Sequence, residues 1–515
     1  MFNSYSNYID RRRLIASAAT LGGALLFSGC GNNGAEELPT DITELSGARL
    51  SKAIKQRRIR CTEVMETYLQ KIHRYNPTYN AIVSMVDDDV LMQKADEADR
   101  ALERGDYWGW MHGMPHAVKD LADAKGLNSS YGSPIFANNV AETDSLPIAR
   151  IRAQGAIFIG KTNAPEFGLG SNTYNAVHGT TGNAYDPALS AGGSSGGAAV
   201  VLALQLTPCA DGSDMMGSLR NPAAFNNVVG FRPSQGRIPS PSLRSELFYD
   251  QLATDGPMGR DVEDTIRLME TMAGGDPGAP LSMRDPFPAF DTFVPPKRSE
   301  VRIGWMADYR GYLPTEKGVL DVCAAALNRL SDSGFIIEET MPKFDLQRLW
   351  ETWLTLRHWF MSGLKPLYDD PETKSFLKPE LIWEIEGGLG MSAAQISDAA
   401  TSRSAWYRAL NDLFEKYDIL ALPTAQVFPF ATDIDWPSSI SGKSMDTYHR
   451  WMEVVIGGTL AGLPVINLPA GFDEKGRPMG IQFMGPMGKD KEVLEFALAY
   501  EAVTDYLDKR PIPRN

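Results

Sequence analysis

Residues 192–197 read Gly-Gly-Ser-Ser-Gly-Gly. The Gly-x-Ser-x-Gly frame centred on Ser194 matches the nucleophile elbow of α/β-hydrolases, a strand-to-helix turn that exposes a reactive serine. That hypothesis requires an acidic residue and a histidine later in the chain, and the only downstream histidines are His358 and His449. His358 falls in an aromatic helical stretch and His449 at an expected helix start, so neither follows a strand. The sequence thus gives a Ser-His-Asp esterase that uses Ser194 little support, and we keep it as an alternative to the hypothesis developed below.

Short apolar runs alternate with helical segments on both sides of this loop. Apolar residues three and four positions apart predict helices over about 47–75 and 86–104. The runs expected to form buried strands are 156–159, 301–305, 335–337, 418–422, 465–468 and 480–484. The proline-rich stretch 274–297 is expected to be a long surface connection. Strands that alternate with helices at this spacing favour an α/β sandwich around a large, mostly parallel or mixed sheet.

The composition is that of an ordinary globular protein. Hydrophobic residues make up 43% of the 515 positions and charged residues 22%, which excludes a disordered or collagen-like chain. Four cysteines in this length exclude a disulfide-stapled miniprotein, and Cys61, Cys209 and Cys323 are expected to be buried thiols. The formal charge of −14 disfavours nucleic acid as the main partner, because an acidic surface repels phosphate backbones.

Residues 155–162, Gly-Ala-Ile-Phe-Ile-Gly-Lys-Thr, match the phosphate-loop pattern G-x₄-G-K-T. A phosphate loop must curve around its ligand, whereas residues 156–159 form a continuous apolar run that is typical of a buried strand. The segment 163–165, Asn-Ala-Pro, follows directly and disfavours the start of a helix there. The match therefore predicts a strand and not a nucleotide site.

A more specific signal comes from several segments together. The main ones are 113–120 (Gly-Met-Pro-His-Ala-Val-Lys-Asp), 192–197 and 212–220 (Gly-Ser-Asp-Met-Met-Gly-Ser-Leu-Arg), with further ones at 160–168, 255–260, 417–424 and 462–465. They resemble the amidase signature family, and Lys119, Ser194 and Ser218 lie 75 and 24 positions apart, as in its Ser–cis-Ser–Lys site. The resemblance extends from about residue 47 to the C-terminus. It implies a single α/β/α sandwich domain around a large mixed, twisted sheet.

Amide hydrolysis requires an activated nucleophile and a site for the developing oxyanion. The resemblance implies that Ser218 attacks the carbonyl carbon, that Ser194 relays a proton and that Lys119 is the base. Lys119 can act only when neutral, and moving its pKa from about 10.4 to about 7 requires roughly 4–5 kcal/mol of environmental bias. Burial under the apolar strand 115–118 can supply this bias through desolvation. The resemblance also implies a cis peptide bond between Gly193 and Ser194.

The same resemblance places the oxyanion hole on the backbone N–H groups of Met215, Met216, Gly217 and Ser218. The family mostly has small residues at the two methionine positions. A backbone N–H donates whatever the side chain, so catalysis requires only that both methionines adopt the necessary φ and ψ. A positive φ at Met216 would strain the loop. The two methionine side chains are expected to narrow the acyl pocket.

Four residues are expected to support the site: Gly193, Ser195, Asp214 and Arg220. Asp214 and Arg220 are predicted to fix the catalytic loop through a charge-assisted hydrogen bond. The chemistry implied by the resemblance uses no metal and no other cofactor. The expected partners are a small-molecule amide and water, with no nucleic acid.

The N-terminus has the features of an export signal. Three arginines at 11–13 precede the apolar run 14–27, which is shorter than the roughly 20 residues of a membrane-spanning helix. Paired arginines at this place indicate the twin-arginine route. The sequence Ser-Gly-Cys that ends at Cys30 resembles a lipoprotein box, in which Cys30 would carry lipid and tether the protein to a membrane, and ordinary cleavage nearby is the alternative. We therefore predict an export signal over 1–30, a polar tether over 31–44 and an amidase domain over 45–515, located in the periplasm or on a membrane face of a bacterium.

These motifs leave the substrate open. The aromatic residues of the segment 340–410 (Trp350, Trp353, Trp359, Phe360, Trp383 and Trp406) have helical spacing and are expected in the core, although an aromatic wall over Ser218 would suit an aryl or extended hydrophobic amide. Carbamate, ester and oligomeric amide cleavage share the same acyl-enzyme. The family's tRNA-linked glutamine amidotransferase is disfavoured by the export signal and the charge. An inactive amidase-like binding protein is the non-enzyme alternative, against which the presence of Lys119, Ser194 and Ser218 argues.

Overall fold

The computed structural model describes residues 37–239, 246–249 and 251–515. One compact unit extends from Asp41 to Asn515, and a separate unit, Met1–Thr40, lies almost entirely outside the described residues, as does the predicted export signal. The domain therefore begins four residues before the predicted boundary at 45. Within it, the Thr43 carbonyl accepts a hydrogen bond from buried Arg260 at 2.6 Å. No helix in the described residues has the length and apolar character needed to cross a membrane.

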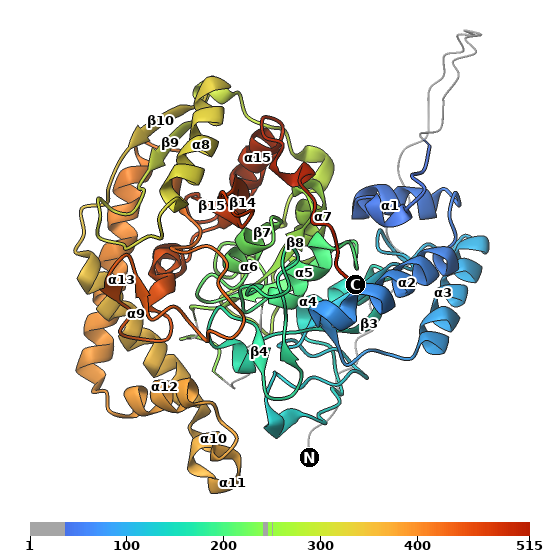
Figure 1. The fold of residues 1–515 in the computed structure, drawn as a ribbon, viewed down its shortest axis with the longest axis horizontal. Coiled ribbons are helices and arrows are strands. Elements are labelled where there is room, and N and C mark those ends of the chain that lie inside the picture. The colour runs from blue at the N-terminus through green and yellow to red at the C-terminus, as the bar shows by residue number, and fades with distance from the viewer. Residues whose placement is uncertain (1–36, 240–245, 250) are drawn as a thin grey trace. The chain divides into compact units, whose positions relative to one another are not determined.

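The centre of the domain is a large mixed β-sheet (Figure 1). Among the described residues it has eight strands in the order β10-β9-β11-β15-β14-β7-β8-β6. Their bounds are β6 (Ala210–Asp214), β7 (Val229–Arg232), β8 (Thr254–Gly259), β9 (Arg302–Trp305), β10 (Ile336–Glu339), β11 (Ile419–Pro423), β14 (Val465–Phe472) and β15 (Pro478–Met484). The strands β10, β9 and β11 are parallel and the remaining pairs are antiparallel. The predicted mixed sheet and all six predicted strands are confirmed, with small shifts of their ends.

A smaller sheet lies beside the large one and carries the lysine-bearing strand. In the described residues its order is β1 (Ile82–Val83), β3 (Ile157–Thr162) and β2 (Pro115–Lys119). Strand β2 packs beside β6, the last strand of the large sheet, without joining it in a backbone ladder. Two further short pairs are β4 (Tyr174–Asn175) with β5 (Gly179–Thr180) and β12 (Ser439–Ile440) with β13 (Lys443–Ser444). The expected large mixed sheet is therefore accompanied by a separate small sheet, and the two meet at β2 and β6.

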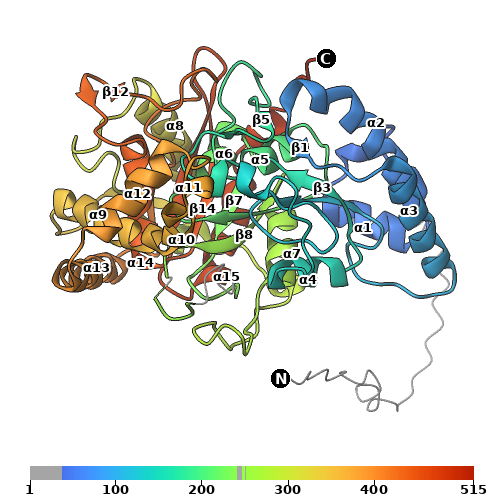
Figure 2. The ribbon, with the colours of Figure 1, turned by 90° about the horizontal axis from the view of Figure 1, so that it is seen from below.

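Helices flank these strands, with α9 to α13 at one end of the domain and α1 to α3 at the other (Figure 2). Helices α6, α8 and α15 pack against β14 or β15. The α-helices are α1 (Gly47–Lys55), α2 (Cys61–Tyr79), α3 (Asp88–Glu103), α4 (Leu146–Ala153), α5 (Gly196–Ala203), α6 (Arg220–Phe225), α7 (Val262–Met272), α8 (Val319–Asp332), α9 (Leu346–Met361), α10 (Lys365–Asp369), α11 (Pro371–Lys374), α12 (Pro379–Leu389), α13 (Ala393–Phe414), α14 (Ile456–Ala461) and α15 (Asp490–Glu501).

The helix predicted over 47–75 is two helices, α1 and α2. Arg57 has a positive φ of 56°, and the N–H of Arg58 turns back to donate to the carbonyl of Ala53 at 2.9 Å. This left-handed turn ends α1, because a residue at positive φ cannot continue a right-handed helix. Periodicity did not reveal the break because both helices bury a stripe with the same spacing. The connection over 274–297 contains no α-helix or strand, as expected.

Helix α5 and the Gly/Ser loop before it form the centre of the site region. Every residue of α5 is buried, and glycine allows its first turn to approach the end of β3 closely. A Cβ at Gly197 would lie 2.4 Å from the backbone nitrogen of Asn163, so any larger residue would force the two segments apart. The small residues of this loop therefore serve close packing as well as chemistry.

Candidate active site

Lys119 is the last residue of β2, and its side chain ends among three serine hydroxyl groups. Its Nζ lies 2.9 Å from Ser194 Oγ, 2.8 Å from Ser195 Oγ and 3.0 Å from Ser213 Oγ. The residue is only 1% exposed, and among the described residues no carboxylate forms an ion pair with Nζ. A buried amine that is surrounded by hydroxyl groups can lose its proton without breaking an ion pair.

Burial lowers the pKa of Lys119 to about 7. The carboxylates of Asp255, Asp211 and Asp214 act in the opposite direction, but their combined effect is smaller than that of desolvation. A substantial fraction of the amine is therefore unprotonated near neutral pH. Both the value and its cause are those expected from the sequence.

Ser194 lies in the Gly/Ser loop, and the peptide bond that joins it to Gly193 is cis, as the resemblance implies. Ser171 holds this peptide at two points. Its hydroxyl donates to the Gly193 carbonyl at 2.6 Å and accepts the Gly193 N–H at 3.2 Å. The N–H of Ser195 donates to the carbonyl of Ser218 at 3.2 Å. The Gly/Ser loop is thus attached to the loop that carries the expected nucleophile.

Residues 215–218 connect β6 to α6, and their backbone conformation resolves the question raised by the two methionines. The positive φ in this segment, 78°, belongs to Gly217 and not to Met216. A Cβ at Gly217 would also lie 2.9 Å from Val455 Cγ2, so both conformation and space require glycine there. Met215 and Met216 are accommodated without left-handed strain.

Asp214 organises this loop from a fully buried position. Its carboxylate accepts hydrogen bonds from the N–H groups of Gly217 (2.9 Å) and Leu219 (3.1 Å) and from Nε of Arg220 (3.0 Å). The Arg232 guanidinium lies 3.5 Å from the same carboxylate and donates to the Asp214 carbonyl. Burial raises the pKa of Asp214, but the two arginines and these hydrogen bonds lower it by a larger amount. The net pKa is well below the ordinary value of an aspartate. The expected ion pair with Arg220 is present and is buried, not a surface contact.

The backbone donors of the loop are not all available. The N–H of Gly217 is already bonded to Asp214. Within the described residues, the N–H groups of Met215, Met216 and Ser218 have no hydrogen-bond acceptor. Oxyanion binding can therefore use these three groups, and Gly217 holds the loop in shape. This narrows the expected set of four donors to three.

A cavity of about 300 Å³ opens in front of these groups. Its lining includes the serines Ser194, Ser213 and Ser218, the methionines Met215, Met216, Met361 and Met452, and Phe360, Leu364 and Arg357. Ser218 is 7% exposed, so its hydroxyl can be reached from the cavity although the loop around it is buried. No group of three or more His, Cys, Asp or Glu side chains in the described residues is arranged to hold a metal ion.

The sequence profile of the Amidase family matches residues 63–494. The chain belongs to the Amidase family. It is 31% identical over 474 residues to an acylamidase of Rhodococcus erythropolis, covering 91% of this chain and 97% of that protein. It is also 31% identical over 493 residues to a glutamyl-tRNA(Gln) amidotransferase subunit of Symbiobacterium thermophilum, covering 91% and 98%. Among solved structures, a bacterial aryl acylamidase of the amidase signature family superposes with a TM-score of 0.84 at 27% identity, covering 91% and 99%.

In this Amidase family member, the wall of the cavity beside Met215 contains a buried arginine that the sequence did not reveal. Arg357 of α9 donates from Nε to Glu384 at 2.6 Å and from one terminal nitrogen to the hydroxyl of Tyr448 at 2.7 Å. Its other terminal nitrogen contacts only the sulfur of Met215, at 3.1 Å, among the described residues. A thioether is a weak acceptor, so this N–H group remains available for a stronger one.

The aromatic residues of the segment 340–410 are divided between core and cavity. Trp350, Trp353 and Trp406 are fully buried, as expected for core residues. Phe360 lines the cavity, and Trp383 is 40% exposed. This segment thus contributes one phenylalanine to the cavity, whose other aromatic lining residues are Tyr131 and Phe167, and not a wall of tryptophans.

The two histidines required by the esterase hypothesis do not reach the cavity. His358 pairs with Glu384 at 2.9 Å, and His449 is fully buried, which lowers its pKa to about 3. Neither lines the cavity that contains Ser194. The base within hydrogen-bonding distance of Ser194 is Lys119, so the geometry disfavours the Ser-His-Asp alternative.

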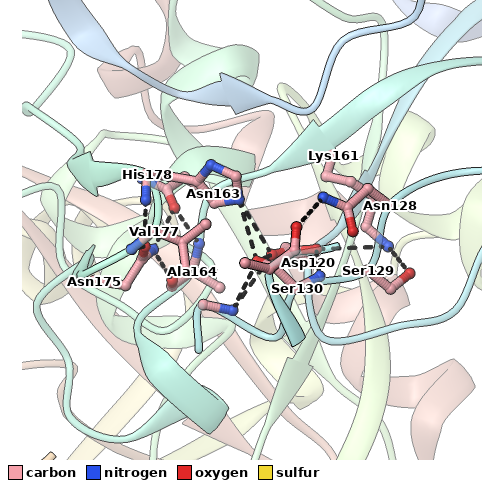
Figure 3. A network of polar contacts seen from close by, with 12 residues as sticks. Asp120, Asn128, Ser129, Ser130, Lys161, Asn163, Ala164, Asn175, Val177 and His178 are labelled. Atoms are coloured by element: carbon pink, nitrogen blue, oxygen red, sulfur yellow. Dashed lines mark hydrogen bonds and ion pairs between the residues drawn. The ribbon is translucent and has the colours of Figure 1, made fainter. Parts of the chain in front are cut away.

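The lysine of the phosphate-loop pattern is used within the protein. Lys161 lies on β3 and is fully buried, with Nζ 3.1 Å from Ser129 Oγ and 3.9 Å from Asp120. Figure 3 shows Lys161 and Asp120 in one network with Ser130 and His178. The pattern forms a strand, as predicted, and its lysine stabilises the turn after Lys119.

Sequence reasoning missed several residues of the site besides Arg357. They are Ser171, Ser213, Arg232, and the pair His116 and Asp211. None of them is the nucleophile, the proton relay or the base that the motifs indicate. The role of each depends on contacts between segments that are distant in sequence. The motif 212–220 did contain Ser213, and its position between two aspartates on a strand was the only available signal.

Proposed function

We propose that this protein hydrolyses carboxamides through an acyl-enzyme on Ser218, with Lys119 as base and Ser194 as proton relay. The observation that carries the proposal is the distance of 2.9 Å between Lys119 Nζ and Ser194 Oγ, in a cavity that Ser218 also lines. Burial, which lowers the pKa of Lys119 to about 7, supplies the neutral amine that a base requires.

In the first step, Ser218 Oγ attacks the amide carbonyl carbon. Its proton passes to Ser194 Oγ as the Ser194 proton passes to Lys119 Nζ, so the amine becomes an ammonium. The carbonyl oxygen becomes an oxyanion, which the free N–H groups of Met215, Met216 and Ser218 would bind. Removing one such donor typically raises the barrier by about 3–4 kcal/mol.

In the second step, the C–N bond breaks and the leaving nitrogen takes a proton from Ser194, which regains one from the Lys119 ammonium. The amine or ammonia departs, and the acyl group remains on Ser218. Water then attacks the ester, again with Lys119 as base, and releases the acid. One proton leaves with the amine and the attacking water replaces it, so Lys119, Ser194 and Ser218 return to their starting protonation states and the cycle consumes only water.

The cavity supports a substrate with an apolar portion and one polar acceptor. Phe360, Met361 and Leu364 provide the apolar lining, and Arg357 provides a donor beside Met215. Two of the similar proteins are named acylamidase and aryl acylamidase, names that denote cleavage of N-acyl compounds. We propose an N-acyl amide or anilide as the substrate class of this protein. Carbamates and esters are alternative substrates of the same acyl-enzyme.

Acylation of the native enzyme tests this proposal. A fluorophosphonate or an activated carbamate should label Ser218, as read by peptide mass spectrometry, and Ser218→Ala should abolish labelling without changing the fold. Label on Ser194 would instead support the α/β-hydrolase alternative. Release assays across amides, anilides, carbamates and esters would then rank substrates, and absence of turnover on all of them would favour the inactive binding protein.

We also propose that the protein is exported and attached to a membrane through Cys30. The support comes from the sequence alone: three arginines at 11–13, the apolar run 14–27 and the cysteine after it. These residues lie outside the described structure. Lipoproteins of this kind carry more than one acyl chain, and two or more chains are needed for stable attachment.

A further inference from the structure

The candidate site is assembled across the join between the two sheets. Lys119 ends β2 of the small sheet, whereas Ser213 belongs to β6 of the large sheet and Ser218 follows that strand. No backbone ladder connects β2 to β6 in the described residues. The distance between base and nucleophile therefore depends on whatever side-chain contact fixes one strand against the other.

Besides the bond from Lys119 Nζ to Ser213, this contact is made by Asp211, the second residue of β6. The backbone N–H of Lys119 donates to both oxygens of the Asp211 carboxylate, at 3.2 and 3.3 Å. The same carboxylate lies 2.9 Å from Nε2 of His116, three residues earlier on β2. One side chain thus replaces the missing ladder bond and contacts the strand at two points.

His116 and Asp211 are both buried, with exposures of 0% and 2%. Because Nε2 of His116 faces a carboxylate, it carries the proton. Nδ1 has no hydrogen-bond partner in the described residues, and the ring packs 5.9 Å from the ring of Phe158. The contact through Nε2 therefore holds the ring against the Asp211 carboxylate, which brings a negative charge to the join.

This charge opposes the function of the base. A buried carboxylate favours the ammonium form of Lys119, and Asp255 on β8 and Asp214 on β6 act in the same direction. Asp214 is compensated by Arg220 and Arg232, and Lys161 on β3 faces Asp211 as well as Asp120. A charge that hinders catalysis and costs desolvation requires a compensating role in the site.

We propose that Asp211 and His116 are positioning residues that hold Lys119 across the join of the two sheets and set the pH range in which it accepts a proton. Asp211 fixes the backbone of Lys119, and His116 fixes the orientation of the carboxylate and spreads its charge. Neither side chain lines the cavity, so neither touches the substrate. The inference rests on the proposed function of Lys119 as base.

The decisive variant is Asp211→Asn, which keeps an acceptor for the Lys119 N–H and removes the charge. We expect the acid limb of the kcat/KM profile to move to lower pH by about one unit, because the ammonium form loses a stabilising neighbour. Because the acceptor that holds the Lys119 backbone is kept, we expect kcat at the plateau to fall less than in His116→Phe, with KM within twofold of the wild type. An acid limb at its wild-type position would overturn the proposal.

Two variants of His116 test the positioning step. In His116→Gln the side-chain N–H can still reach Asp211, and in His116→Phe it cannot. We expect kcat to be close to wild type in the first and at least tenfold lower in the second, with similar KM. Equal kcat in the two variants would assign the pair a purely structural role and contradict the proposal.

Controls separate misfolding and failure of the proposed function from failure of this inference. Asp490→Asn is a matched control, because Asp490 is also buried and accepts a backbone N–H, that of Ser234 at 2.7 Å, but neither residue lines the cavity or contacts Lys119. It should change thermal stability without moving the acid limb. If Lys119→Ala retains activity, the proposed base is wrong. If Lys119→Ala is inactive and Asp211→Asn keeps the wild-type limb, only the positioning inference fails.

Discussion

Two buried cations belong to the site, Lys119 in contact with Ser194 and Arg357 in the cavity lining, and their surroundings have opposite effects. The Nζ of Lys119 is surrounded by hydroxyl groups, and burial lowers its pKa to about 7. Burial also lowers the pKa of Arg357, but the adjacent Tyr448 and Glu384 raise it by more, to above its ordinary value. Equal burial thus produces a group that can lose its proton and a group that cannot.

The difference has two sources, the intrinsic basicity of each group and its partner. A guanidinium stays charged near neutral pH, and the carboxylate in direct contact fixes its position, so Arg357 serves as a fixed hydrogen-bond donor. Serine hydroxyls leave Lys119 free to exchange a proton with them. Under the proposed function, Lys119 transfers protons and Arg357 orients the substrate. Substitutions of the two residues should therefore affect different kinetic quantities.

The largest expected effect comes from removing the base. Lys119→Ala should lower kcat/KM by about 10³–10⁴-fold, near the upper range for a general base. Lys119→Arg should not restore activity, because a guanidinium remains charged near neutral pH, and it would give both ends of the cavity the same character. Steady-state kinetics on the best substrate of the panel would measure both variants. Substantial activity of the arginine variant would show that the cation acts only through its charge.

The next effect concerns the contribution of the Arg357–Glu384 ion pair to the stability of the fold. Glu384→Gln leaves the Arg357 guanidinium buried without its counter-charge and should lower the free energy of unfolding by about 3–5 kcal/mol. Denaturant unfolding would measure the change. Glu386→Gln, on the exposed face of the same helix, is the control and should stay within about 0.5 kcal/mol. Similar losses in both variants would mean that the ion pair contributes little.

The two ends also differ in how far the sequence predicts them. Lys119, Ser194 and Ser218 could be predicted because their motifs are local, and the apolar run before Lys119 even indicates the desolvation that lowers its pKa. Arg357 and Glu384 lie on two different helices, 27 residues apart. In each helix the residue occupies one position among apolar neighbours, and helical periodicity does not show which polar side chain turns inward.

The join of the sheets was unpredictable for a related reason. His116 and Asp211 are 95 residues apart. Asp211 lies in β6, whose sequence Ala-Asp-Gly-Ser-Asp has no apolar run that would predict a strand. Their contact replaces a backbone ladder, which sequence patterns assume to be continuous. Likewise, the left-handed turn that ends α1 occurs at Arg57 and not at a glycine or asparagine, so the sequence does not indicate it. The strands β3, β9, β10, β11, β14 and β15 and the motif residues were predictable, whereas strands β6 to β8, the separation into two sheets and the contacts between elements were not.

A change of pH should affect the lysine end alone. Below pH 7 Lys119 is protonated and cannot accept a proton, so kcat/KM should fall about tenfold per pH unit and reach about one hundredth of its plateau near pH 5. Arg357 remains charged throughout this range, so KM should change little. The measurement is a kcat and KM profile from pH 5 to 9. A profile that is flat down to pH 5.5 would be incompatible with Lys119 as the base.

A smaller effect is expected from truncating the arginine. Arg357→Met removes the donor beside Met215 and should raise KM about tenfold for a substrate with an acceptor oxygen, corresponding to about 1.4 kcal/mol for one hydrogen bond to a charged group. For a matched substrate that lacks the acceptor, KM should be nearly unchanged. Comparison of the two substrates in wild type and variant gives a double-mutant cycle. An equal change for both would indicate a general distortion of the cavity.

The smallest expected effect on turnover comes from removing residues 1–40. The lining residues that the structure describes begin at Leu121, so we expect a chain that begins at Asp41 to keep kcat and KM within about twofold of the full chain. Cys30→Ser in the full chain should change location without changing turnover. The protein would move from the membrane fraction to a soluble one if Cys30 is lipidated, whereas an intact Met1 in the cytosol would exclude export. Because the domain includes contacts from Thr43 onward, a truncation that continues past residue 43 should destabilise the protein, which separates the role of the tether from that of the fold.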